Sequence, residues 1–146
     1  MTPLNSVSAD SDSWEETLRQ WAQRLSPLAL GKRLTMLMQS IASEHEKPLL
    51  AAISQQYHQP EEQRRWQIFA QAEALGFSTP VGALALSQFL SHGSMAPDGL
   101  APVYPEPQLS SQMLHCALVM LITQLAENPV DGVRLLIERS YALEVA

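Results

Sequence analysis

Apolar residues recur three and four positions apart through most of this 146-residue chain, in segments that prolines separate. Such spacing places the apolar side chains on one face of an α-helix. Proline ends a preceding helix but suits the first turn of the next, so Pro27, Pro48, Pro60, Pro80 and Pro129 predict helix starts. Their irregular spacing argues against a tetratricopeptide-like solenoid, whose repeat is about 34 residues. The pattern predicts an all-α fold: an irregular bundle of six or seven helices.

The expected helices differ in how much of their circumference is apolar. The first is expected to begin near Ser13, which has capping-box spacing to Glu16. The segments 80–90 and 109–126 are apolar almost all round, which is typical of central helices. Ser110 or Ser111 is the expected N-cap of the second of these. Each of the other helices should bury one stripe of side chains along its length. In chain order, the expected stripes are Trp14, Leu18, Trp21 and Leu25; Leu30, Leu34, Leu37, Met38 and Ile41; Leu49, Leu50, Ile53 and Tyr57; Trp66, Phe69, Ala70 and Glu73; and Val133, Leu136, Ile137 and Tyr141.

Composition limits the class of protein. The length fits one domain, expected over residues 12–146, and the small and polar residues 1–11 predict a disordered tail. A net charge of −6 disfavours nucleic-acid binding, and we interpret Lys32-Arg33 and Arg64-Arg65 as solvated helix positions. No signal peptide is recognisable, and the longest apolar run, 116–122, is far shorter than the ~20 residues that span a bilayer, so no membrane insertion is expected.

Residues 93–108, between the fifth and sixth helices, differ in kind from the rest. They contain four prolines and two glycines, which predicts an extended segment. Leu100, Val103 and Tyr104 suggest that it packs on the domain. Its backbone groups cannot all pair internally, so a partner or water must satisfy some of them. The candidate interaction residues here are Gly93, Ser94, Pro97, Leu100, Pro102, Val103, Tyr104, Pro105 and Pro107. The alternative is a structural strap across the bundle.

Two tryptophans form a second candidate interaction surface. Trp14 and Trp21 share one face of the first helix, and tryptophan is enriched at binding hot spots. The alternative is that both side chains pin this helix to the bundle.

The sequence offers no recognisable catalytic, metal-binding or cofactor-binding pattern. His115 and Cys116 are adjacent and so face different directions on a helix, and Cys116 is expected to be buried and inert. A single cysteine excludes an internal disulfide and suits a reducing cytoplasm. An enzyme would need a polar pocket that gathers several of four dispersed residues, namely His45, His58, His92 and Glu73.

The second half of the chain resembles an uncharacterised family of small bacterial proteins. The resemblance lies in residues 72–76 (AEALG), 79–86 (TPVGALAL), 93–97 (GSMAP), 100–103 (LAPV), Pro105, Pro107 and Leu109, and covers about residues 60–146. Members of that family carry a helix, a Gly-Ser-x-x-Pro turn, a proline-rich stretch and an apolar helix in this order. They are often encoded beside secretion genes, type VI clusters especially. The resemblance implies a secretion context but no activity.

Together these features predict a cytoplasmic, non-enzymatic accessory or adaptor protein of a bacterial secretion system, acting through protein–protein contacts and without a cofactor. The partner would be a secretion-system component or an effector. The alternative is an effector-specific secretion chaperone, which the small size and acidic charge suit. The sequence leaves both a monomer and a homo-oligomer open.

Overall fold

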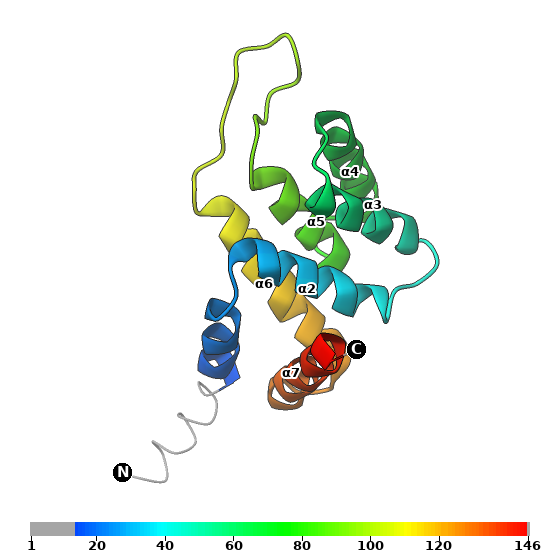
Figure 1. Cartoon of the computed structure of the whole chain (residues 1–146), viewed down its shortest axis with the longest axis vertical. Helices are drawn as coiled ribbons and strands as arrows, with labels where there is room; N and C mark the ends of the chain where they lie inside the picture. The colour runs from blue at the N-terminus through cyan, green and yellow to red at the C-terminus, as the bar shows by residue number, and fades with distance from the viewer. Residues whose placement is uncertain (1–13, 146) are drawn as a thin grey trace.

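The computed structural model describes residues 14–145, which form seven helices and no strand, as predicted. The expected tail, residues 1–11, and the expected cap at Ser13 lie outside the described residues. Residues 14–23 are helical, and six helices follow: α2 (Pro27–Gln39), α3 (Lys47–His58), α4 (Glu62–Leu75), α5 (Pro80–Leu90), α6 (Leu109–Leu125) and α7 (Pro129–Val145). Figure 1 shows them as an irregular bundle, with a long loop between α5 and α6.

Local capping chemistry explains the starts of three helices, α2, α5 and α7. The Ser26 hydroxyl oxygen accepts a hydrogen bond from the Ala29 amide at 3.1 Å, and Thr79 serves α5 in the same way through the Gly82 amide at 3.0 Å. In both helices a proline follows the cap, as the sequence predicts. The Asn128 side chain accepts from the Asp131 amide at 2.9 Å at the start of α7. These helix starts are therefore encoded within a few residues.

One expected helix start and one expected cap were wrong, although α6 begins at Leu109 as predicted. Pro60 precedes α4 instead of lying in its first turn, because α4 begins at Glu62. Neither Ser110 nor Ser111 caps α6, whose N-cap is Gln108 without a side-chain hydrogen bond. The Ser110 hydroxyl donates to the Ser87 carbonyl instead, so a contact with α5 takes the group that was expected to cap.

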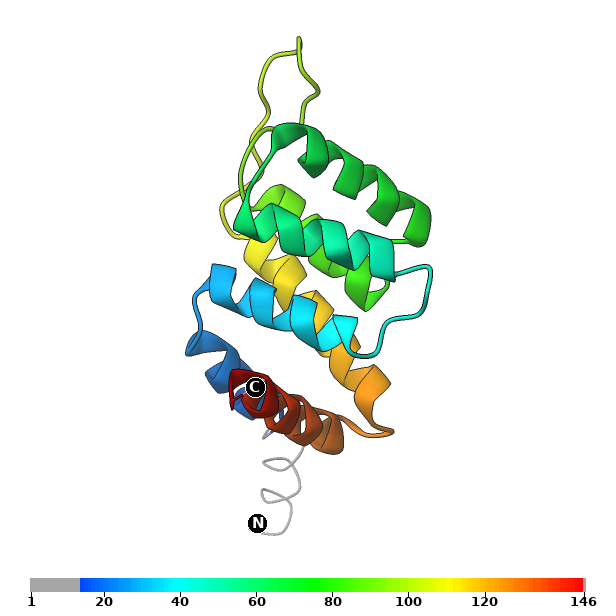
Figure 2. The same ribbon diagram turned by 45° about the vertical axis from the view of Figure 1, so that its right-hand side comes forward.

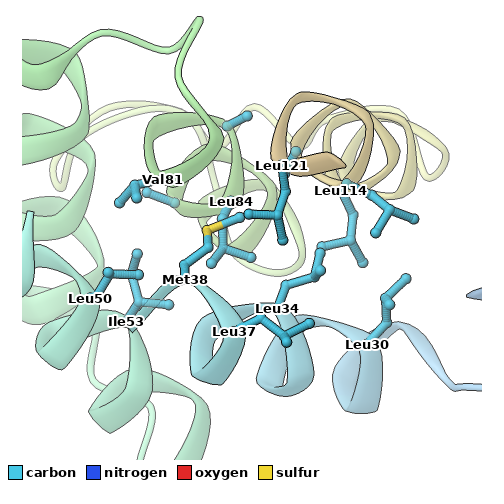
Figure 3. Packing of buried hydrophobic residues seen from close by; sticks show 14 of the residues in the cluster. Leu30, Leu34, Leu37, Met38, Leu50, Ile53, Val81, Leu84, Leu114 and Leu121 are labelled. Carbon is cyan, nitrogen blue, oxygen red and sulfur yellow. The ribbon is translucent and has the colours of Figure 1, made fainter. Parts of the chain in front are cut away.

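The core lies where α2, α3, α5 and α6 meet. Figure 3 shows side chains from all four helices converging, and α5, which is buried over most of its surface, packs most extensively on α6. The N-terminal helix and α7 lie at the end of the bundle opposite the loop, and both views agree on this (Figures 1 and 2). The labelled members of the core are Leu30, Leu34, Leu37, Met38, Leu50, Ile53, Val81, Leu84, Leu114 and Leu121.

Three predicted faces need correction. The buried residues of α4 are Arg65, Ile68 and Ala72. Of the predicted face, Trp66 and Phe69 are half-buried against Phe89, whereas the prediction was wrong for Ala70 and Glu73, which are exposed. Ile41 lies beyond the end of α2 and is exposed, and Tyr141 faces away from the core on α7.

Cys116 is exposed and not buried, although it lies in an apolar helix. The core face of α6 consists of Leu114, Ala117, Leu118 and the residues one turn further on. That arrangement leaves His115 and Cys116 on the solvent side. The apolar composition of α6 therefore does not mean that every side of this helix is buried.

Among the described helices, none alone has the length and apolar character of a membrane span. The pair formed by Leu109–Leu125 and Pro129–Leu143 meets that requirement only when taken together, and the two are bent by 102° at their junction.

Candidate functional site

The loop of residues 93–108 extends beyond the helices at one end of the bundle (Figures 1 and 2). Leu100, Val103 and Tyr104 are 66%, 52% and 70% exposed, so the prediction that they pack on the domain was wrong. Met95 is exposed as well. A strap across the bundle would bury these side chains, and their exposure contradicts that alternative.

Hydrogen bonds inside the loop give it a defined shape. The Met95 amide donates to the Val103 carbonyl at 2.6 Å. The Ser94 hydroxyl oxygen accepts from the amides of Ala96 and Val103, both at 2.9 Å. At the tip, the Leu100 amide donates to the Pro97 carbonyl at 3.2 Å. Two predicted interaction residues, Ser94 and Val103, are thus brought together by the loop's own hydrogen bonds, and a third, Pro97, accepts the hydrogen bond at its tip.

A buried arginine holds the start of the loop. Arg65 of α4 is 1% exposed, and its Nε and Nη2 donate to the Phe89 carbonyl, while Nη1 donates to the Glu62 carboxylate. The guanidinium carbon lies 3.9 Å from the centre of the Phe89 ring. Gly93 has a φ of +85°, and a Cβ there would lie 2.8 Å from the Arg65 guanidinium. The first residue of the loop therefore rests on Arg65, where only glycine fits.

Sequence reasoning missed this role by treating Arg64-Arg65 as solvated. The available signal was position: Arg65 precedes Ile68 by three residues and Ala72 by seven, which places it on the apolar stripe of α4. Burial lowers the pKa of Arg65, and the Glu62 carboxylate partly opposes this.

The two roots of the loop are also tied to each other. The Ser87 hydroxyl donates to the Ser110 carbonyl at 2.8 Å, and the Ser110 hydroxyl donates to the Ser87 carbonyl at 2.7 Å. This reciprocal pair joins the last turns of α5 to the first turn of α6. The loop is exposed, but both of its ends are anchored in the bundle.

A cavity of about 480 Å³ lies at the base of the loop. Ser91 and His92, where the chain leaves α5, line it together with Ser110, where the chain enters α6. Gln88 of α5 and Tyr57 of α3 line it as well. Burial raises the pKa of Tyr57, which keeps its phenol neutral. Loop and cavity are thus parts of one region.

The cavity does not gather the four residues that an enzyme would need, namely His45, His58, His92 and Glu73. Of the four, His92 lines this cavity, whereas His45, His58 and Glu73 are not among its described lining residues. His45 pairs locally with Ser43, at 3.2 Å between Nδ1 and the hydroxyl oxygen. Within residues 14–145, no group of three or more histidine, cysteine or carboxylate side chains is placed to hold a metal ion.

The two predicted tryptophans lie at the other end of the bundle. Trp14 lines a cavity of about 570 Å³ with Val133 and Ile137 of α7. Trp21 lies beside Ser140 of α7, and both indoles are partly buried against the core. Their positions favour a role in holding the N-terminal helix to the bundle, and they do not join the loop's surface.

Fold and site together define a class: an all-α protein whose α5–α6 connection presents exposed apolar side chains above a cavity. The chain belongs to a family of unknown function, DUF6931, whose profile matches residues 8–144. The family match therefore includes the first helices, which the resemblance over residues 60–146 left out. No curated protein and no solved structure matches the chain.

Proposed function

We propose that the protein is a non-enzymatic adaptor that binds a protein partner through the loop of residues 93–108. The observation that supports this is the exposure of Leu100, Val103 and Tyr104 on a loop whose shape is fixed by internal hydrogen bonds. A pre-shaped loop loses little conformational entropy on binding, and clustered exposed apolar side chains are typical of contact surfaces.

The expected setting is the cytoplasm of a bacterium, beside a secretion system of the type VI kind. This part of the proposal depends on the resemblance of the segments 72–86 and 93–109 and on nothing in the geometry. The partner would therefore be a component of that secretion machinery with an apolar groove that accepts the loop.

Co-purification from the native bacterium tests the proposal. The tagged wild-type chain is compared with the triple variant Leu100→Ser, Val103→Ser, Tyr104→Ser. A matched control, Met36→Ser, Val130→Ser, Tyr141→Ser, removes three side chains that are also exposed but lie on α2 and α7.

We expect secretion components to co-purify with the wild type and the control, but not with the loop variant. All three chains should melt at nearly the same temperature, because the substituted side chains are exposed. Equal recovery of the same components with the loop variant would show that the loop is not the binding element. Recovery of one secreted effector, and of no machinery component, would favour the chaperone alternative.

A further inference from the structure

We propose that residues 101–107 form a polyproline II ligand, and that the partner binds them in a groove lined by aromatic rings and edged by basic side chains. The inference rests on the proposed adaptor function, because it names the kind of surface that would receive the loop. Three observations support it: the restricted backbone of the segment, its exposed and unpaired groups, and its charge.

The sequence of the segment restricts its backbone, because six of its seven residues are prolines or directly precede one. The prolines are Pro102, Pro105 and Pro107, and the residues before them are Ala101, Tyr104 and Glu106. Proline fixes φ at about −65° and disfavours the helical region for the residue before it. In the structure, residues 101–106 belong to no helix, strand or turn. An extended backbone with these restrictions is typical of a polyproline II helix.

Val103 is the one residue of the segment that no proline restricts, and hydrogen bonds to the other limb of the loop hold it. Its amide donates to the Ser94 hydroxyl oxygen at 2.9 Å, and its carbonyl accepts from the Met95 amide at 2.6 Å. The segment is therefore shaped before it meets a partner. A ligand that is already shaped loses little conformational entropy on binding.

Most backbone carbonyls of the segment are available to a partner. Among the described residues, none donates a hydrogen bond to the carbonyls of Ala101, Pro102, Tyr104 and Pro105. A polyproline II helix has no internal hydrogen bonds, so its carbonyls are acceptors for a binding surface. Tryptophan and tyrosine side chains combine an apolar ring with an N–H or O–H donor, so a groove built from them can pair with these carbonyls.

The spacing of the side chains fits a groove of this kind. Three residues per turn place every third side chain on one edge of a polyproline II helix. One edge consists of Ala101, Tyr104 and Pro107, all of which are exposed, with Tyr104 at 70%. Pro102 and Pro105 have the spacing PxxP, which proteins bind in grooves lined by aromatic rings. The segment therefore points to an aromatic groove as its binding surface.

The charge of the loop indicates what borders the groove. Residues 93–108 include Asp98 and Glu106, both exposed, and contain no lysine, arginine or histidine. Binding surfaces are arranged with complementary charge, and like charges suppress wrong partners. The edge of the groove should therefore carry lysine or arginine side chains.

Competition with synthetic peptides tests the chemistry of the groove. The full chain is immobilised, loaded with the secretion component that it retains, and washed with decaproline, which forms a polyproline II helix, or with a flexible Gly-Ser decapeptide. We expect decaproline at about millimolar concentration to release the component, and the Gly-Ser peptide to leave it bound. Release by both peptides alike, or by neither, would overturn the proposal.

Two proline variants locate the ligand within the loop. Pro105→Ala frees the backbone of the segment and removes a ring, so it should weaken the affinity for the purified component roughly three- to tenfold. Pro97→Ala makes the same change at the exposed tip, outside residues 101–107, and should leave the affinity unchanged. Equal effects of the two variants would contradict the proposed ligand.

Salt tests the basic edge of the groove. Glu106→Gln should weaken binding at low ionic strength and have less effect at high ionic strength, because salt screens exposed charges. An affinity that is the same for wild type and Glu106→Gln at low ionic strength would rule out a basic side chain facing Glu106.

The serine variant of the adaptor experiment separates the two proposals. If the combined change Leu100→Ser, Val103→Ser, Tyr104→Ser loses the component while decaproline and Pro105→Ala have no effect, the adaptor function stands and this inference is overturned. If the serine variant retains the component, or if the wild type retains none, the adaptor function fails and this inference fails with it.

Discussion

Arg65 and Phe89, 24 residues apart, are joined by two hydrogen bonds: Nε and Nη2 of Arg65 donate to the Phe89 carbonyl at 3.0 and 2.9 Å. The Phe89 carbonyl lies in the last turn of α5, where carbonyls have no donor from their own helix. The arginine of α4 thus supplies a cap for α5 and supports the start of the loop.

Replacing Arg65 by methionine should destabilise the protein by about 2 kcal/mol, because the Phe89 carbonyl would lose both donors while staying covered. Glu62→Gln is the matched control, since the Glu62 side chain is half exposed and its ion pair should contribute less than about 1 kcal/mol. Urea denaturation measures both free energies of unfolding. Equal losses in the two variants would contradict a capping role for Arg65.

The two loop glycines provide a second comparison. Gly93 and Gly99 have φ values of +85° and +91°, but a Cβ at Gly99 would meet no heavy atom within 4 Å, whereas one at Gly93 would overlap the Arg65 guanidinium. Gly99→Ala should therefore cost about 1 kcal/mol from backbone strain alone. Gly93→Ala should cost about 2–3 kcal/mol, since overpacking adds to the strain. Thermal denaturation that gives the two variants the same melting temperature would argue against the close contact.

The sequence correctly predicted those features of the fold that depend on interactions between residues close together in the chain. The helix starts at Pro27 and Pro80 and the burial of α5 follow from a few neighbouring residues, and the structure confirms them. The orientation of α4 was mispredicted because it depends on a buried arginine whose acceptor lies 24 residues away. Likewise, the exposure of Leu100 depends on how the whole loop leaves the bundle.

The candidate site was predictable only in part. Proline content marked the segment 93–108 as unusual, and it is the loop that projects from the bundle. Gln88 gave no signal, because its side-chain hydrogen bond goes to the Ile53 carbonyl of another helix. Side-chain hydrogen bonds across helices leave no periodic trace in a sequence.

Gly31 offers a test of packing, because the effect of Gly31→Ala on stability should change sign when the Tyr57 side chain is removed. It lies inside α2, and a Cβ there would be 2.6 Å from the ring carbon of Tyr57 that bears the hydroxyl. Gly31→Ala should therefore destabilise the protein by about 1 kcal/mol, because the overlap outweighs the gain in helix propensity. In a Tyr57→Ala background the same change should stabilise by up to about 1 kcal/mol. Destabilisation of similar size in both backgrounds, measured by urea denaturation, would exclude Tyr57 as the cause.

Asp131, in the first turn of α7, should make stability depend on pH. A hydrogen bond from the Asn128 side chain, and then one from Arg134, hold the pKa of Asp131 below its usual value. A carboxyl whose pKa is lower in the folded state stabilises the protein above its unfolded pKa of about 3.9 and loses that effect as the pH falls through the lower folded value. Wild type should therefore melt above Asp131→Asn at neutral pH, and the difference should shrink below about pH 4. A difference in melting temperature that stays constant from neutral pH into strong acid would show that the charge of Asp131 contributes nothing.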